Sequence, residues 1–168
     1  MKTMLLTAIA VMTMATAANA QIFDALKIVK WSSNAKATAA GEYDVTFTAT
    51  IDKGWHIYSQ NVGKGGPIPT AISLAKGATA ELVGKAKESS THKKEGIDEN
   101  FNMKVTKFAE KVTFTQHIKA KDPKQPLKGA IEFMTCNSER CLPPAEYEFS
   151  IKLPETKAAT TKKSKKRN

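Results

Sequence analysis

The sequence is poor in the residues from which many enzyme sites are built. Only two cysteines and three histidines occur among its 168 residues, and neither a second cysteine pair nor a close histidine pair completes a zinc site. No glycine-rich phosphate loop precedes a predicted helix, and no serine, histidine and aspartate constellation is visible. These absences disfavour a zinc protein, a nucleotide-binding enzyme and a hydrolase.

Long apolar runs are missing outside the first twenty residues, MKTMLLTAIAVMTMATAANA. This segment contains an early lysine, an apolar stretch from Met4 to about Met14 and small residues that end at Ala20, an order typical of a secretory signal peptide. The stretch is shorter than the roughly 20 residues that span a bilayer. We therefore expect residues 1–20 to be a cleaved signal peptide. The mature chain should begin near Gln21, have no transmembrane segment and be periplasmic.

Acidic residues are too few to balance the basic ones, and the formal net charge is +10. Six of the basic residues lie in the last segment, TKAATTKKSKKRN, which contains no acid. We expect this segment, residues 156–168, to be a disordered solubilising tail, because it has no periodic apolar residues. Its functional alternative is weak, salt-dependent attraction to an anionic envelope surface. Nucleic acid is not an expected partner of a secreted chain.

Alternating apolar residues predict that the rest of the chain consists of β-strands. The clearest strand is GEYDVTFTATID, in which every second residue from Tyr43 to Ile51 is apolar. The segments KVTFTQHIKA and AEYEFSIKL follow the same period. Weaker strands are predicted at Ala25 to Trp31, Trp55 to Ser59, Thr70 to Leu74, Ala80 to Val83 and Ala130 to Thr135.

Turns that contain glycine and proline separate these short strands, and no convincing helix lies among them. This pattern predicts an all-β fold. We expect one domain over residues 21–155, an immunoglobulin-like antiparallel β-sandwich. A small barrel is the alternative.

Both cysteines, Cys136 and Cys141, lie in EFMTCNSERCLPP, and three functions are open to them. Two thiols this close pair readily in an oxidising compartment. A loop of six residues, however, contributes only about 2 kcal/mol as a structural disulfide, against roughly 3 kcal/mol for fifteen residues. A zinc site lacks further ligands, and a Cu(I) site would need Met134 as a third soft donor. The third function is a redox pair that exchanges with an external thiolate.

The residues around the pair favour the redox interpretation. Arg140 favours the thiolate of its neighbour Cys141 and Glu139 opposes it, so the sign of their sum is open. Pro143 and Pro144 fix their own φ angles and stiffen the chain after the second cysteine. A stiff exit suits two sulfurs that must stay close in both redox states. The motif lacks the Cys-x-x-Cys spacing and the βαβ setting of a thioredoxin.

Four motifs together resemble one family. The segments GWHIYSQN, GGPIPTAISL, ENF and TCNSERCLPP are similar to the N-terminal domain of the thiol:disulfide interchange protein DsbD, over roughly Trp31 to Leu153. The cysteine pair followed by Pro-Pro is the most specific of them. The resemblance implies a periplasmic immunoglobulin-like sandwich that takes electrons from a membrane-embedded or thioredoxin-like donor. It then passes them to periplasmic thiol oxidoreductases, and no organic cofactor is needed.

The resemblance also assigns roles to single residues. Cys136 and Cys141 match the redox pair, with Cys141 as the attacking cysteine. The family shields its pair with a flexible cap loop that bears a phenylalanine, and the matches in DENFN are Phe101 and, as an acid near the thiols, Glu99. The alternative to a cap-loop role is that Phe101 is simply a core residue.

Two further residues are expected beside the pair. Tyr58 fits an aromatic that packs against it, and His56 stands where another tyrosine is expected. A histidine titrates near neutral pH and a tyrosine does not. Because His56 and Tyr58 alternate with Trp55 and Ile57, we expect them on the face opposite the core.

Two function classes follow from these residues. The first is a thiol:disulfide relay, an oxidoreductase domain whose pair cycles between dithiol and disulfide. These 168 residues contain neither a membrane domain nor a thioredoxin-like domain, so the donor is expected to be a separate envelope protein. The second is a non-catalytic binding or scaffold module of the cell envelope with a structural disulfide.

Overall fold

The computed structural model describes residues 24–155, and the predicted signal peptide and basic tail lie outside this range. Within it the chain forms one short helix, α1 (Ala25–Ile28), followed by eleven strands. The strands are β1 (Val29–Ala39), β2 (Glu42–Ile51), β3 (His56–Tyr58), β4 (Ala71–Leu74), β5 (Ala80–Ser89), β6 (Lys93–Asp98), β7 (Met103–Ala109), β8 (Lys111–Ala120), β9 (Leu127–Phe133), β10 (Thr135–Cys136) and β11 (Ala145–Ile151). No helix in this range is long and apolar enough to cross a membrane.

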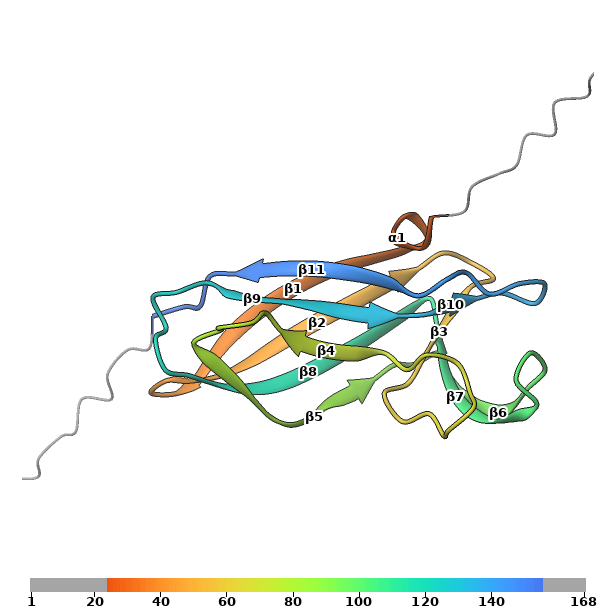
Figure 1. Ribbon diagram of the computed structural model, residues 1–168, viewed down its shortest axis with the longest axis horizontal. Helices are drawn as coiled ribbons and strands as arrows, with labels where there is room; N and C mark the ends of the chain where they lie inside the picture. The colour runs from red at the N-terminus through yellow and green to blue at the C-terminus, as the bar shows by residue number, and fades with distance from the viewer. Residues whose placement is uncertain (1–23, 156–168) are drawn as a thin grey trace, which may run out of the picture.

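The strands form an immunoglobulin-like β-sandwich of antiparallel sheets (Figure 1). One long sheet has the strand order β1-β2-β8-β5, and the sheet that packs against it has the order β11-β9-β4. A third sheet, β10-β3-β7-β6, lies at one end of the sandwich, on the right in Figure 1. The all-β, immunoglobulin-like fold expected from the sequence is confirmed.

The main core lies between the two longer sheets. Every second residue of β2 from Tyr43 to Ile51 is buried, as the apolar alternation predicts. Phe47 of β2 meets Phe149 of β11 across the sandwich, with ring centroids 4.8 Å apart. Trp55, at 9% exposure, also belongs to this core.

The third sheet is built from continuations of strands of the sandwich. Glu110, with φ +57°, separates β7 from β8, and Met134 separates β9 from β10. The turn at residues 52–55 separates β2 from β3. One face of this sheet contributes Ile57 and Phe108 to the main core. Its other face points away from the core and carries a cysteine.

One predicted strand is partly wrong. The segment from Ala25 to Trp31 begins with helix α1, because the Asp24 carboxylate caps it by accepting the Leu26 N–H at 2.9 Å. Strand β1 starts only at Val29 and continues well beyond the predicted end.

Two edge strands differ from the sequence prediction. Strand β6 is unpredicted, because its sequence KKEGID has no apolar alternation and most of its residues are exposed. Strand β5 continues past Val83 to Ser89 through a register shift, within which Gly84 has φ +65°. A positive φ of this size favours glycine and lets the strand bulge.

Candidate functional site

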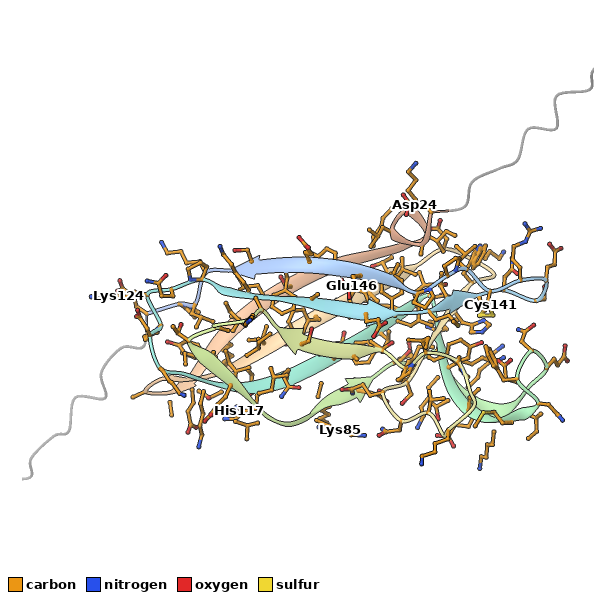
Figure 2. All side chains as sticks on the ribbon, in the orientation of Figure 1. Asp24, Lys85, His117, Lys124, Cys141 and Glu146 are labelled. Atoms are coloured by element: carbon orange, nitrogen blue, oxygen red, sulfur yellow. A yellow bond between two sulfur atoms is a disulfide. The ribbon has the colours of Figure 1, made fainter. Side chains whose placement is uncertain are left out.

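Cys136 and Cys141 form a disulfide at the end of the sandwich that the third sheet occupies (Figure 2). Their Cα atoms are 4.0 Å apart, and the two residues form an isolated antiparallel bridge. Cys136 is fully buried, whereas Cys141 is partly exposed. An external thiolate therefore reaches the residue Cys141 more easily than Cys136.

The disulfide loop, residues 136–141, is also closed by backbone and side-chain hydrogen bonds that do not involve the sulfurs. The Asn137 side chain accepts hydrogen bonds from the N–H groups of Glu139 and Arg140, at 2.9 and 2.8 Å. The backbone N–H of Asn137 donates to the Arg140 carbonyl at 2.9 Å, and that of Leu142 donates to the Thr135 carbonyl at 2.9 Å. These bonds need no S–S bond, so they favour two adjacent thiols in the reduced protein as well.

A second apolar cluster, separate from the main core, surrounds the disulfide. Its fully or nearly buried members are Tyr58, Val105 and Cys136, and its partly buried members are Val62, Phe101, Met103, Met134 and Cys141. We call this set the disulfide cluster. Phe101 lies in the turn between β6 and β7, residues 99–102, which we call the cap loop. Its ring meets that of Tyr58 edge-on, with centroids 6.0 Å apart. The structure thus brings Phe101 and Tyr58 to the cysteine pair.

The register of the third sheet places His56 beside the pair. His56 lies directly opposite Cys136 in the β3–β10 pairing, and Tyr58 lies opposite Lys107 in the β3–β7 pairing. The residue between them, Ile57, points into the main core. His56 and Tyr58 therefore share the face opposite the core, as their alternation predicts. That face is not open surface, however, since Tyr58 is fully buried.

A buried aspartate that the sequence analysis missed connects these residues. The Tyr58 hydroxyl and the Lys107 ammonium both donate to Oδ2 of Asp98, at 3.1 and 3.0 Å. His56 Nε2 lies 3.1 Å from the Tyr58 oxygen. Asp98 is fully buried at the end of β6, and its Oδ1 accepts the Asn100 N–H at 3.0 Å. The only available signal was its place directly before the cap loop, where Asp often begins a turn.

The environment fixes the protonation states of this network. Burial is the largest cause that lowers the pKa of His56 from 6.5 to about 4. The charge of Lys107 lowers this pKa further, whereas the charge of Asp98 partly opposes the shift. Burial, followed by the Asp98 charge, raises the pKa of Tyr58 well above its ordinary value. Burial would raise the pKa of Asp98, but hydrogen bonds from Lys107, Asn100 and Tyr58 outweigh it and hold that pKa below its ordinary value. At neutral pH, His56 is neutral, Tyr58 is protonated and Asp98 is ionised.

Glu99 lines the same cavity as His56, Asp98 and Lys107, but within residues 24–155 it makes no hydrogen bond or ion pair with them. Glu99 is exposed, and the cavity, of about 420 Å³, lies between the cap loop and the disulfide loop. Asn100, Asn137 and Ser138 are also part of the lining. Across residues 24–155, no group of three or more His, Cys, Asp or Glu side chains is arranged to hold a metal ion.

A β-sandwich with one partly exposed cysteine of a short disulfide, and with the other cysteine buried in a cluster that contains two aromatic side chains, has the features of a thiol:disulfide exchange domain. The family comparison agrees with this class. The chain belongs to the family of the N-terminal domain of the thiol:disulfide interchange protein DsbD, whose family model matches residues 27–153. No curated protein matches the sequence.

Two solved structures share the fold. The N-terminal periplasmic domain of ScsB from Proteus mirabilis is similar with a TM-score of 0.55 and 17% identity, over 73% of this chain and 45% of that one. The reduced N-terminal domain of DsbD from Neisseria meningitidis is similar with a TM-score of 0.50 and 19% identity, over 78% of this chain and 90% of that one. The match thus spans less than half of the Proteus chain.

Proposed function

We propose that this protein is a thiol:disulfide relay of the bacterial periplasm. Its Cys136–Cys141 pair alternates between disulfide and dithiol and carries two electrons from a donor to an acceptor. The observation that carries the proposal is the unequal exposure of the two cysteines within one pre-formed turn. Family membership adds support, since interchange is the activity for which the family is named.

The exchange proceeds through mixed disulfides. A donor thiolate attacks Cys141 and breaks the Cys136–Cys141 bond, and the second donor thiol then releases the reduced pair as the donor becomes a disulfide. In the second half-reaction, the Cys141 thiolate attacks an acceptor disulfide. The Cys136 thiolate then attacks Cys141 Sγ, which restores the internal disulfide and leaves the acceptor as a dithiol. No organic cofactor takes part.

The partners follow from this chemistry and from the family. The donor is a membrane-embedded or thioredoxin-like protein with a dithiol, and the acceptors are periplasmic thioredoxin-like oxidoreductases. Residues 1–20 serve as a cleaved signal peptide in this proposal, and residues 156–168 as a basic tail that contacts anionic envelope surfaces. A periplasmic location keeps the acceptors within reach of the pair.

The reduction potential of the pair tests the relay. The protein is equilibrated in glutathione or dithiothreitol redox buffers, and the oxidised fraction is determined by alkylation and mass measurement. A potential above about −250 mV supports a pair that exchanges electrons. A potential below roughly −300 mV marks a structural bond and overturns the relay in favour of a binding module.

A further inference from the structure

The proposed function, on which this inference rests, requires the buried Cys136 to lose its proton. Cys136 must become a thiolate before it attacks the mixed disulfide at Cys141, because the thiolate is the nucleophile. Cys136 has 0% exposure and lies in one cluster with Phe101, whereas Cys141 is partly exposed. Water can take the proton of Cys141, but the proton of Cys136 needs an acceptor inside the site.

Most ionisable groups of the site are unsuited to accept it. Tyr58 remains protonated, since its pKa is raised, and its hydroxyl hydrogen is directed to Asp98. The Asp98 carboxylate already accepts hydrogen bonds from Tyr58, Lys107 and the Asn100 N–H. Lys107 donates to that carboxylate as a cation. Glu99 is exposed and lies outside the disulfide cluster, which leaves the neutral imidazole of His56.

His56 is placed for the transfer. It is the direct cross-strand partner of Cys136 in the β3–β10 pairing. Residues opposite one another in an antiparallel pair point to the same face, with Cβ atoms about 5 Å apart. His56 also lines the cavity beside the disulfide loop, and its side chain is 14% exposed. It therefore neighbours the residue that bears the reacting thiol and also borders a cavity through which water can reach it.

The hydrogen-bond chain fixes the tautomer of His56. Tyr58 has a single hydroxyl hydrogen and donates it to Asp98, so its oxygen must accept from His56 Nε2. The hydrogen of the neutral imidazole is then on Nε2, and Nδ1 carries a free lone pair. Within residues 24–155, no hydrogen bond occupies Nδ1. Asp98 and Tyr58 act as positioning residues, and Nδ1 is the open acceptor.

We propose that Nδ1 of His56 accepts the proton of Cys136 as this buried thiol attacks Cys141 Sγ in the mixed disulfide. The sulfur electron pair of Cys136 forms the new Cys136–Cys141 bond. The electron pair of the broken bond leaves with the partner sulfur as a thiolate. The proton passes from His56 to water through the cavity, so the imidazole is neutral again for the next turnover.

Burial first, and then the lysines that face the ring, keep the imidazole neutral between turnovers. Lys107 of β7 and Lys94 of β6 oppose the imidazolium, and Asp98 of β6 favours it. Tyr58 of the same strand occupies Nε2 with a hydrogen bond. An imidazole in this setting holds a proton only briefly and releases it readily to water.

The reaction of the reduced protein with the aromatic disulfide 5,5′-dithiobis(2-nitrobenzoate) separates the two steps. Attack by Cys141 releases a first thionitrobenzoate at a rate proportional to reagent concentration. Displacement by Cys136 releases the second at a rate that is independent of that concentration. Because positioned bases contribute about 10²–10⁴-fold, His56→Gln should slow the second phase at pH 7 by at least about tenfold and leave the first unchanged.

Matched controls and the wild-type pH profile decide the outcome. His117→Gln removes an imidazole from β8, far from Cys141 in Figure 2, and should change neither phase. The wild-type second phase should stay nearly constant from pH 8 to pH 5, whereas in His56→Gln it should fall about tenfold per pH unit, as for an unassisted thiol.

Three results would overturn the inference. The first is a second phase that is as fast in His56→Gln as in the wild type. The second is a wild-type second phase whose rate itself falls tenfold per pH unit. The third is a second phase that is slowed by Glu99→Gln and not by His56→Gln. The wild-type profile decides even where the His56 variant does not fold. A wild-type protein with no first phase at all would instead contradict the relay itself.

Discussion

Phe101 of the cap loop packs edge-on against Tyr58, with the two ring centroids 6.0 Å apart. Tyr58 lies in the same apolar cluster as the fully buried Cys136. This cluster is separate from the main core of the sandwich. Access to the disulfide can therefore change without loss of the fold.

Replacing Phe101 by Ala should speed reduction of the disulfide by dithiothreitol, because the attacking thiolate gains access to the sulfurs. Phe101 is only partly buried and lies outside the main core. The loss in unfolding free energy should therefore stay below the roughly 3–5 kcal/mol of a core Phe→Ala change. Reduction kinetics and urea unfolding measure the two effects.

Phe108→Leu is the matched control for Phe101. Phe108 lies on β7 with 1% exposure and faces the main core. Its truncation should lower the free energy of unfolding and leave the reduction rate of the folded protein unchanged. An unaltered reduction rate in Phe101→Ala would show that this side chain does not shield the disulfide.

The two cysteines should differ as trapping variants. Cys136→Ser retains the partly exposed Cys141 and should accumulate a stable mixed disulfide with a thioredoxin-like acceptor, because the resolving thiol is missing. Cys141→Ser leaves only the buried Cys136 and should form little adduct. Intact-mass measurement under non-reducing conditions counts the adducts. Equal trapping by both variants would contradict the assigned order of attack.

His56 should make the fold sensitive to mild acid. Its pKa of about 4 in the folded protein lies below the ordinary 6.5, so the unfolded chain binds the proton first as the pH falls from 6.5 to 4. Acidification in this window then favours the unfolded state, by up to about 3 kcal/mol at its lower end. His56→Gln should remove this loss and His117→Gln should retain it, as urea unfolding at pH 4 and pH 7 can show. Parallel pH profiles for the wild type and His56→Gln would contradict the burial effect.

The parts of the fold that were predictable are those where burial leaves an alternating pattern. β2 and β8 each place an apolar residue on the core side at nearly every second position, and both were located from the sequence. β6 is an edge strand held by backbone hydrogen bonds to β7, with mostly exposed side chains. Pairing of this kind imposes no apolar pattern, so the sequence carries no signal for it.

The sequence pointed to some of the residues that the structure brings together around the disulfide, but not to the hydrogen-bond network beside them. The cysteine motif and the cap-loop segment pointed to Cys136, Cys141 and Phe101, and the structure brings these residues into one cluster. Asp98 was missed because its partners Tyr58 and Lys107 lie on two other strands. Only the register of the third sheet brings them together, and no local pattern encodes that register.

Asn137 should tune the reduction potential through the turn that it closes. Its side chain accepts the N–H groups of Glu139 and Arg140, so Asn137→Ala should loosen the turn and reduce the tendency of the two thiols to close. The disulfide then becomes less stable relative to the dithiol, and the potential should rise by about 30 mV for each tenfold loss in the closure constant. Ser138→Ala is the matched control, since the exposed Ser138 side chain makes no such bond within residues 24–155. Equilibration in glutathione buffers compares the two variants, and equal potentials would mean that the turn does not contribute to holding the sulfurs together.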